Sequence, residues 1–342
     1  MAPTKSRKPR IALVGSETLR GKEILSVFAS RKFPLASFEL FDPDVEEEYS
    51  KLSQFKDEAK VVHALSPSAL EGLDLVFLAA DAATNLRYGR LAAEKDFQAI
   101  DLGETFNADV NVPLVVAGIN DKGLREDRPP LVANPHPAAI VLAHLLGTLH
   151  AGFGVARAVS IVLEPASAYA EEGIHELAEQ STALLGSGTA CRRVFPESLA
   201  FNLLARTGRA GRKGSPPLEA RIGAEVRRVL GPEELPLSVS VVLAPVFHTY
   251  SIMTHVELAR DASASDLKER LRANDVFRLP APGEESRVSP TAVAGKDHIY
   301  LGEIRKDSTL RKSFWLWVIA DNLTVGSALN AYGIARALVG EA

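Results

Sequence analysis

The sequence is poor in cysteine: Cys191 is its only thiol in 342 residues. A single thiol excludes an intramolecular disulfide framework and a cysteine-rich zinc site, and we predict no metal centre. No apolar run reaches the roughly 18–20 residues that a membrane-spanning helix needs. The basic N-terminal tail, with Lys5 and Arg7, is not followed by the apolar segment of a secretory signal. These absences favour a cytoplasmic location.

The chain also lacks an excess of either charge. It carries 39 lysine and arginine residues against 43 aspartate and glutamate residues, for a net charge of −4. Because this balance is spread along the chain, it gives no electrostatic basis for binding nucleic acid. We therefore expect neither a nucleic-acid nor a membrane partner.

The length of the chain predicts two domains, because it exceeds the usual size of one hydrophobic core. We place the first domain at residues 1–137 and 322–342, and the second at residues 138–321. An alanine-rich helix predicted at Val325–Val339 returns the chain to the first domain.

The first domain opens with a predicted strand, helix and strand at Arg10–Gly15, Lys22–Arg31 and Phe38–Asp42. Further strands are predicted at Val61–Ala64, Leu73–Ala80 and Ala99–Leu102, with a helix at Asn85–Lys95. This alternation predicts a doubly wound, Rossmann-type α/β domain. Dinucleotide binding is one interpretation of its first turn, since a glycine there lets a pyrophosphate approach the helix amides. A plain strand-to-helix turn is equally compatible, because Thr18 replaces the motif's central glycine.

The second domain has a different pattern. Strands are predicted at Ala158–Glu164, Leu237–Pro245 and Ser251–Leu258, and helices at Glu172–Leu185 and Pro217–Leu230. Strands grouped with long helices predict an α+β domain with a mixed or antiparallel sheet. The Gly- and Arg-rich stretch Arg206–Ser215 is expected to be a solvated loop.

One turn, Leu131–Ile140, is where a nucleophile would be expected. It connects a predicted strand to an apolar helix, and such turns in α/β proteins direct amides and a side chain toward a binding cleft. The turn contains no Cys, Ser or Thr.

Several motifs resemble those of the aspartate-semialdehyde dehydrogenase family. The strongest, Asp321-Asn-Leu-Thr-Val-Gly-Ser-Ala-Leu-Asn-Ala331, is similar to that family's C-terminal Asp-Asn-Leu-x-x-Gly-Ala-Ala-x-Asn-Ala signature. Others follow the family's order along the chain: Val112–Val116 with Asn120, Ala200–Leu203 and Ala244–Val246. The likeness is to a divergent paralogous branch that lacks the catalytic cysteine.

The resemblance implies an enzyme of amino-acid biosynthesis. In that family a cysteine thiolate attacks the aldehyde, hydride passes to NADP, and phosphate releases the acyl group. A histidine is the general acid and base, a glutamine orients the intermediate, and two arginines hold the carboxylate and phosphate.

The nucleophile position is degenerate here. The family's Ser-Asn-Pro-Asn-Cys corresponds to Ala133–Pro137, which places Pro137, or with a one-residue gap His136, where the cysteine would be. Neither residue can form and release a thioester. Cys191 lies far along the chain and is expected to be a small buried apolar residue.

The other chemical positions also differ from the family. Tyr250 takes the place of the general-base histidine, and a phenol is a poor base near neutral pH. His248 is a possible substitute, since residues two apart in a strand share a face. The family's glutamine corresponds to Glu164, and its substrate-binding residues correspond to Asn107, Leu243 and Arg221, of which only Arg221, beside Glu219, keeps its charge.

The resemblance implies an NADP site, whereas Asp42 at the end of the second strand favours NAD. A carboxylate there accepts from a free ribose 2′-hydroxyl and repels a 2′-phosphate. Thr18 and Glu17 weaken the case for any dinucleotide, so the domain binds NAD, NADP or neither. The expected cofactor-binding residues are Gly15, Glu17, Thr18, Leu19, Asp42, Ala80 and Asn322.

Three functions remain open at this point. The first is a binding or partner protein that has lost the thioester chemistry. The second is an enzyme of different chemistry using His136, Glu164, His248 or Tyr250, which requires these groups to lie within about 8 Å of one another and to be reachable from solvent. The third is an active NAD(P)-dependent aspartate-semialdehyde dehydrogenase. The resemblance also implies a homodimer formed by the sheet of the second domain, with which the apolar strand Val239–Val246 is compatible.

Overall fold

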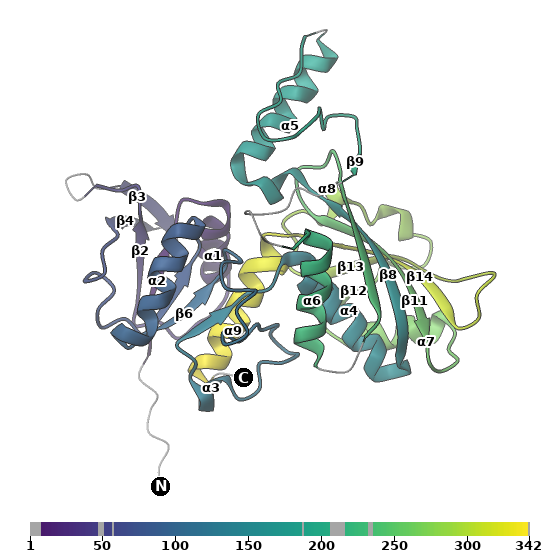
Figure 1. Ribbon diagram of the computed structural model, residues 1–342, viewed down its shortest axis with the longest axis horizontal. Helices are drawn as coiled ribbons and strands as arrows, with labels where there is room; N and C mark the ends of the chain where they lie inside the picture. Colours follow the sequence, from purple (N-terminus) through teal and green to yellow (C-terminus); the bar gives the residue numbers. More distant parts are fainter. Residues whose placement is uncertain are drawn as a thin grey trace. The chain divides into compact units, whose positions relative to one another are not determined.

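The structure, a computed structural model, describes residues 8–46, 51–56, 58–186, 188–205, 216–231 and 235–340. It forms two compact units, residues 1–135 with 327–342 and residues 136–326 (Figure 1). The Gly- and Arg-rich stretch Arg206–Ser215 lies outside the described residues. None of the described helices is long and apolar enough to cross a membrane.

The first unit is built on a seven-stranded sheet in the order β3-β4-β2-β1-β5-β6-β7. All neighbours pair in parallel except the edge pair β3 and β4. This arrangement confirms the Rossmann-type prediction, although the hairpin strand β3 was not predicted. The strands are β1 (Arg10–Val14), β2 (Ser37–Asp42), β3 (Lys51–Phe55), β4 (Glu58–Ala64), β5 (Leu75–Leu78), β6 (Gln98–Asp101) and β7 (Leu131–Ala133).

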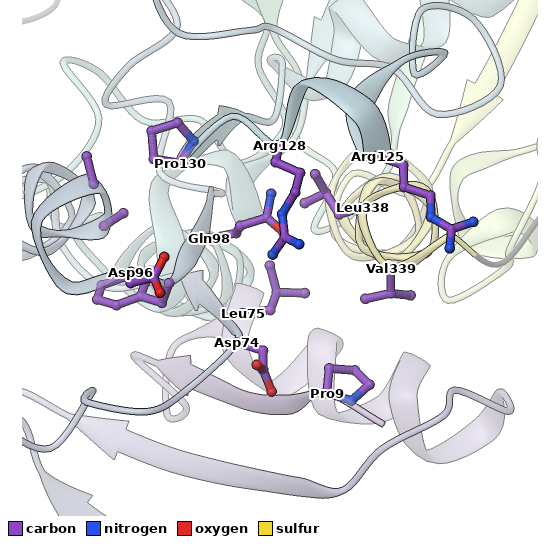
Figure 2. A pocket seen from close by; sticks show the side chains of 13 residues that line it. Pro9, Asp74, Leu75, Asp96, Gln98, Arg125, Arg128, Pro130, Leu338 and Val339 are labelled. Atoms are coloured by element: carbon purple, nitrogen blue, oxygen red, sulfur yellow. The ribbon is translucent and has the colours of Figure 1, made fainter. Parts of the chain in front are cut away.

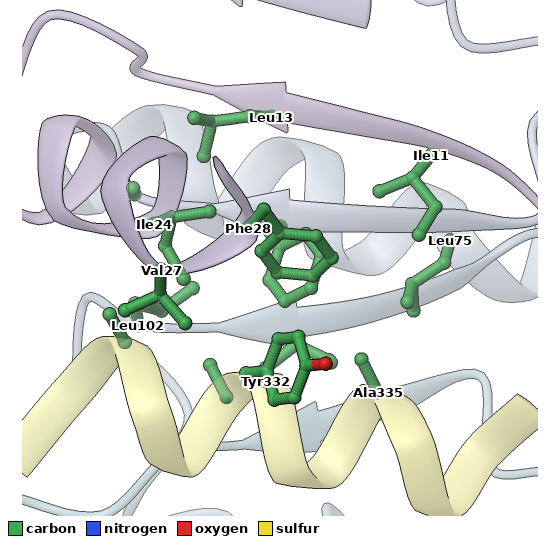
Figure 3. Packing of buried hydrophobic residues seen from close by; sticks show 14 of the residues in the cluster. Ile11, Leu13, Ile24, Val27, Phe28, Leu75, Leu102, Tyr332 and Ala335 are labelled. Atoms are coloured by element: carbon green, nitrogen blue, oxygen red, sulfur yellow. The ribbon is translucent and has the colours of Figure 1, made fainter. Parts of the chain in front are cut away.

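The helices of the first unit are α1 (Leu19–Ser30), α2 (Ala82–Lys95), α3 (Leu124–Asp127) and α9 (Leu329–Val339). Phe28 of α1 lies at the centre of the core, fully buried. Its ring contacts Phe77 at 5.3 Å and Tyr332 at 5.1 Å between centroids, both in edge arrangements, and Figure 3 shows Phe28 facing Tyr332. The last helix therefore completes the core of the unit that begins the chain. It starts at Leu329 rather than at Val325, because a π-helical turn, η3 (Thr324–Ala328), precedes it.

The second unit has its own seven-stranded sheet in the order β12-β13-β14-β11-β8-β10-β9. β10 runs parallel to β8 and β12 parallel to β13, while the other neighbours are antiparallel. The sheet is therefore mixed, within the predicted α+β class. Its strands are β8 (Val155–Glu164), β9 (Leu204–Ala205), β10 (Leu237–Leu243), β11 (Tyr250–Leu258), β12 (Phe277–Arg278), β13 (Ile299–Lys306) and β14 (Ser313–Ala320).

Helices cover one face of this sheet. α4 packs against β8 and β11, and α6 packs against β10 and α4 (Figure 1). The opposite face leaves Val159 and Ile161 of β8 exposed by 47% and 41%. The helical elements are α4 (Pro137–Phe153), η1 (Ala166–Tyr169), α5 (Ala170–Leu185), α6 (Leu218–Leu230), α7 (Ala264–Arg272), η2 (Glu285–Arg287) and α8 (Pro290–Val293).

Candidate functional site

The predicted turn Leu131–Ile140 ends in a helix that begins with an unusual cap. His136 is the N-cap of α4, and its Nδ1 accepts a hydrogen bond from the Ala138 amide at 3.1 Å. The His136 amide donates to the Glu225 carboxylate at 2.6 Å. The first turn of α4 therefore holds the imidazole of His136, a residue that is 4% exposed, and α6 holds its backbone.

His136 meets two more of the predicted site residues. Its Nε2 lies 3.3 Å from the Tyr250 hydroxyl, and that hydroxyl donates to Oε1 of Glu164, also at 3.3 Å. Tyr250 opens β11 and Glu164 closes β8, so the sheet brings them together. These O···O and N···O distances are longer than the common values for such bonds.

The hydrogen bond from the Ala138 amide to Nδ1 of His136 indicates which groups of this cluster donate and which accept. A backbone amide can only donate, so Nδ1 of His136 carries no proton, and a neutral ring then carries its proton on Nε2. Nε2–H accordingly donates to the Tyr250 oxygen, which frees the phenol proton for Glu164. The cluster thus pairs a neutral imidazole with a carboxylate acceptor.

Two contributors to the cluster were not predicted from the sequence. Tyr169 donates to the second oxygen of Glu164 at 3.4 Å, and Glu225 holds the His136 backbone. Tyr169 is 5 positions from Glu164, and Glu225 is 89 positions from His136. The Glu225 contact depends on the packing of α6 beside α4, which no local pattern signals.

Thr249, immediately before Tyr250, has a strained backbone. Its φ is +76°, its side chain is fully buried, and its hydroxyl has no partner among the described residues. The family's motif, as aligned on Tyr250, has glycine at this position. The backbone keeps a conformation that suits glycine while the chain carries a β-branched residue there.

His248 does not join the cluster through any contact in the described part of the chain. The expectation that it shares a strand face with Tyr250 was wrong, because β11 begins at Tyr250 and the positive φ of Thr249 interrupts the alternation. His248 is half-buried.

Pro137 is the first residue of α4, a position where its missing amide costs nothing. The chain at Gly326 packs on it so closely that a Cβ at Gly326 would lie 2.5 Å from the proline's Cβ. The position aligned with the family's thiol is therefore occupied by a helix-starting ring packed against backbone.

Cys191 differs from the sequence expectation. It is half-exposed rather than buried, and its thiol donates to the Glu179 carboxylate at 3.2 Å. Partial desolvation and this carboxylate raise the pKa of the thiol above its ordinary value. A raised pKa disfavours the thiolate that nucleophilic attack requires.

The three residues aligned with the family's substrate-binding positions lie in different parts of the structure. Leu243 is 3% exposed and belongs to a hydrophobic cluster with Leu177, Phe195 and Leu199. Arg221 is half-buried on α6, and Asn107 is buried in the loop after β6 in the first unit. An apolar cluster at Leu243 offers no cation to an anionic substrate.

The loop that carries Asn107 is organised by Asp101. The Asp101 carboxylate accepts from the amides of Gly103, Thr105 and Phe106 at 2.9, 2.7 and 3.1 Å. Burial nevertheless raises the pKa of this carboxyl above its ordinary value, against the effect of those amides.

The C-terminal signature residues have structural partners. Asn330 donates to Asn134 at 2.8 Å and accepts from Ala117, which fixes the end of the turn in the first unit. Asn322 of the second unit, expected at the cofactor, accepts from the Thr249 amide and from Ser167, both at 3.1 Å.

The first turn of the Rossmann unit retains much of a dinucleotide-binding geometry. A Cβ at Gly15, φ +84°, would lie 2.6 Å from the Ala80 nitrogen, and one at Gly21 would lie 2.1 Å from the Gly15 oxygen. Thr18 is the N-cap of α1 and accepts from the Gly21 amide at 3.0 Å. The amides of Leu19 and Arg20, which also open α1, have no acceptor among the described residues. Backbone N–H groups at the start of a helix can donate hydrogen bonds to a phosphate.

The acidic residues around this turn are already engaged. Asp42, 5% exposed, accepts from the Asp44 amide at 3.1 Å and from the Glu17 amide at 3.5 Å. The Glu17 side chain pairs with Lys51 of β3 at 3.3 Å, which offsets its charge near a phosphate. The residues present thus fit a dinucleotide, with Thr18 as the departure from the motif.

Comparison with known proteins follows the same division of the chain. A family profile described as "Semialdehyde dehydrogenase, NAD binding domain" matches residues 10–126, and one described as "Semialdehyde dehydrogenase, dimerisation domain" matches residues 146–325. An aspartate-semialdehyde dehydrogenase of Rickettsia bellii is 27% identical over 336 residues, 98% of each chain. Aspartate-semialdehyde dehydrogenase 2 of Vibrio cholerae is 26% identical over 335 residues, again 98% of each.

Solved structures agree with these matches. Aspartate semialdehyde dehydrogenase II of Vibrio cholerae, in a structure described as complexed with ASA, has a TM-score of 0.88 at 25% identity and covers 98% and 99% of the two chains. A probable aspartate-semialdehyde dehydrogenase of Pseudomonas aeruginosa has a TM-score of 0.89 at 26% identity, covering 97% and 99%. The Candida albicans enzyme, described as bound to NADP, shares the fold with a TM-score of 0.68 at 16% identity, covering 97% and 98%.

Proposed function

The chain belongs to the aspartate-semialdehyde dehydrogenase family, and we propose that it binds a dinucleotide without performing the family's thioester reaction. The observation that carries this proposal is Pro137, which starts α4 at the position aligned with the catalytic thiol. Covalent catalysis of this kind requires a group that is both nucleophile and leaving group. A proline ring is neither, and the imidazole of His136 has no sulfur with which to form a thioester.

The aligned substrate-binding position supports the same proposal. Leu243 lies in an apolar cluster, and an arginine there would have to be desolvated among Leu177, Phe195 and Leu199. Losing a desolvated arginine partner costs an anionic substrate about 2–5 kcal/mol. Weak substrate binding is therefore expected together with the missing nucleophile.

The family's own activity is the second candidate, and the comparisons favour it over its loss. The relatives described above carry the name aspartate-semialdehyde dehydrogenase and match the chain over nearly its full length. This candidate requires a nucleophile other than a thiol in the turn, or a role for Cys191. The raised pKa of the Cys191 thiol counts against that role.

An activity assay separates these two candidates. Purified protein is mixed with aspartate semialdehyde, phosphate and NADP or NAD, and reduced nucleotide is followed by absorbance. Our proposal expects no turnover above the rate without protein. Turnover that persists in Cys191→Ser would establish the family's activity with a different nucleophile, and turnover lost in that variant would assign it to Cys191.

A different chemistry in the second unit is favoured by one observation, the contact of His136, Tyr250 and Glu164. The sequence-based requirement of close approach is met, since the bonded atoms lie 3.3 Å apart. The same side chains are only 2–4% exposed, which leaves little surface for a substrate. We therefore rank this alternative below the binding function.

For the cofactor, we propose NAD rather than NADP. A bound dinucleotide would place its pyrophosphate at the amides of Leu19 and Arg20, its ribose at Asp42, and would supply hydride-transfer chemistry. Asp42 repels a 2′-phosphate and accepts from a 2′-hydroxyl. Calorimetric titration with both nucleotides tests this, and equal, strong binding of NADP would contradict the role of Asp42. In Asp42→Asn, the preference for NAD should fall.

We propose a homodimer formed through the exposed face of the second sheet. Val159 and Ile161 place apolar surface there, beside the half-buried Met253 on β11. Burial of such surface drives association. Ile161→Lys should shift the mass measured by light scattering toward the monomer. Leu52→Lys, at a residue 64% exposed in the first unit, is the matched control and should not.

A further inference from the structure

A cavity of about 590 Å³ lies at the edge of the first sheet opposite the dinucleotide turn. Its lining includes Pro9, Asp74 and Pro130, which directly precede β1, β5 and β7, and Gln98, which starts β6. The dinucleotide turn follows the other end of β1. Because β1 has five residues, a rise of about 3.3 Å per residue separates the two sites by roughly 15 Å. We call this cavity the basal pocket.

The basal pocket presents charges of both signs. Figure 2 shows Arg128 reaching toward the middle of the pocket, with Asp96 and Asp74 at its border. Neither Arg128 nor Asp96 has a charged or hydrogen-bonded side-chain partner among the described residues. Asp74 is held by the Arg10 amide at 2.7 Å, and Gln98 by the Pro129 carbonyl at 3.1 Å.

Both unengaged residues have a left-handed backbone conformation. Asp96 has φ +57° at the end of α2, and Arg128 has φ +42° at the end of α3. Helices commonly end in this left-handed conformation. Here the two positions end separate helices and line the same cavity.

The second arginine of the pocket, Arg125, lies against the end of α9. A Cβ at Gly340 would lie 2.5 Å from Nη1 of Arg125, so the guanidinium rests on the backbone at the end of α9. A cation there is favoured by the negative end of the helix dipole. Arg128, by contrast, reaches toward the middle of the pocket (Figure 2).

The floor of the pocket is apolar. Leu75 and Phe97 are 2% and 3% exposed, and Leu338 of α9 is 6% exposed. The cavity volume is within the range of about 300–1,000 Å³ that is typical of small-molecule sites. A ligand that fits this lining has a carboxylate for Arg128, a cation for Asp96 and room for a side group over the floor.

We propose that the basal pocket binds a free α-amino acid, with Arg128 pairing with its carboxylate and Asp96 with its ammonium. A phosphate or a dicarboxylate would be repelled by the carboxylates of Asp96 and Asp74. A polyamine meets the like charge of Arg128. A zwitterion satisfies both sides, and the site lies at the other end of β1 from the dinucleotide turn.

The test uses the full-length protein and titration calorimetry against each standard L-amino acid. At least one should bind, and its N-acetyl derivative and its methyl ester, which lack the ammonium and the carboxylate, should each bind at least about tenfold more weakly, a factor equal to 1.4 kcal/mol. Arg128→Gln and Asp96→Asn should weaken the free amino acid to a similar extent. Arg90→Gln, at an exposed arginine of α2 outside the pocket, should not.

Three results would overturn the proposal. They are no binding by any amino acid, equal binding of the blocked derivatives, and unchanged affinity in both pocket variants. Titration with NAD is run on the same samples. Its result should be the same in the wild type and in the pocket variants, so failure of the dinucleotide proposal leaves this test intact.

Discussion

The Tyr250 hydroxyl lies 3.3 Å from Nε2 of His136 and 3.3 Å from Oε1 of Glu164, bridging an imidazole and a carboxylate inside the second unit. In the alignment with the family's motifs, Tyr250 and Glu164 correspond to the histidine and the glutamine, and His136 is next to Pro137 at the position of the thiol. The hydrogen bonds of the bridge run from His136 through Tyr250 to Glu164. None of these three side chains is a thiol.

Tyr250→Phe should lower the free energy of unfolding by about 1–3 kcal/mol, because it removes the hydrogen bonds of the Tyr250 hydroxyl to two buried side chains, those of His136 and Glu164. Urea denaturation measures the change. Tyr300→Phe is the control, since the Tyr300 hydroxyl has no partner in the described part of the chain. If Tyr250→Phe and Glu164→Gln prove additive in a double-mutant cycle, the two side chains are not coupled.

Thr249→Gly should stabilise the protein by about 1 kcal/mol. The change relieves the strain at φ +76° and removes a buried hydroxyl without a partner among the described residues, which together outweigh the entropy cost of glycine. Thermal unfolding measures it. Thr249→Ala keeps the Cβ and should recover only part of the gain.

The control for this prediction is Thr254→Gly. Thr254 is equally buried, but it lies within β11 and its hydroxyl bonds to Ser160 at 3.0 Å. That substitution should destabilise. A loss of stability in both variants would mean that Thr249 is not strained.

Pro137→Cys should create a thiol with a pKa below the ordinary value near 8.5, because it would lie in the first turn of α4. Iodoacetamide alkylation as a function of pH, in a Cys191→Ser background, measures that pKa. The wild-type thiol of Cys191 is the reference and should titrate above its ordinary value. Identical pH profiles would show that the helix terminus does not act on this position.

Stability should depend on Asp307 at neutral pH and not in acid. The amides of Thr309 and Leu310, followed by the Thr309 hydroxyl and the Trp315 indole, hold the pKa of Asp307 well below its ordinary value of 3.8. A depressed carboxyl pKa stabilises the fold above the unfolded value and loses this effect as pH falls through the folded value.

Asp307→Asn should therefore lower the urea midpoint near neutral pH and differ less from the wild type as pH falls below 3.8. The comparison variant is Asp275→Asn, at an exposed carboxylate. A difference that grows in acid would contradict the assignment. His255 lies 3.4 Å from Asp307, so Asp307→Asn removes this charge pairing together with the hydrogen bonds.

The fold class followed from the sequence because the parallel strands are short apolar runs ended by glycine or an acid, as in Arg10–Gly15 and Phe38–Asp42. Strands β13 and β14 were missed. β14, Ser313–Ala320, is apolar on both faces, so it lacks the alternation by which a half-exposed strand is found.

The site was predictable only where a motif fixed a position. His136, Glu164 and Tyr250 were identified by alignment with the family's motifs, whereas their hydrogen bonds join residues 86 and 114 positions apart. The positive φ of Thr249 has no sequence signal apart from the family's glycine. Cys191 was misjudged because a lone thiol is usually buried, whereas this one is half-exposed and bonded to Glu179.

The place of α9 in the first unit has a consequence for synthesis. Translation delivers residues 8–135 well before residues 327–340, yet Ala331, Tyr332 and Ala335 belong to the same buried cluster as Phe28. The Rossmann unit is thus the first to leave the ribosome and the last able to close its core. Until then, the apolar surface around Phe28 is open to chaperones or to aggregation, so the nascent chain should be most vulnerable in the half of the protein that was made first.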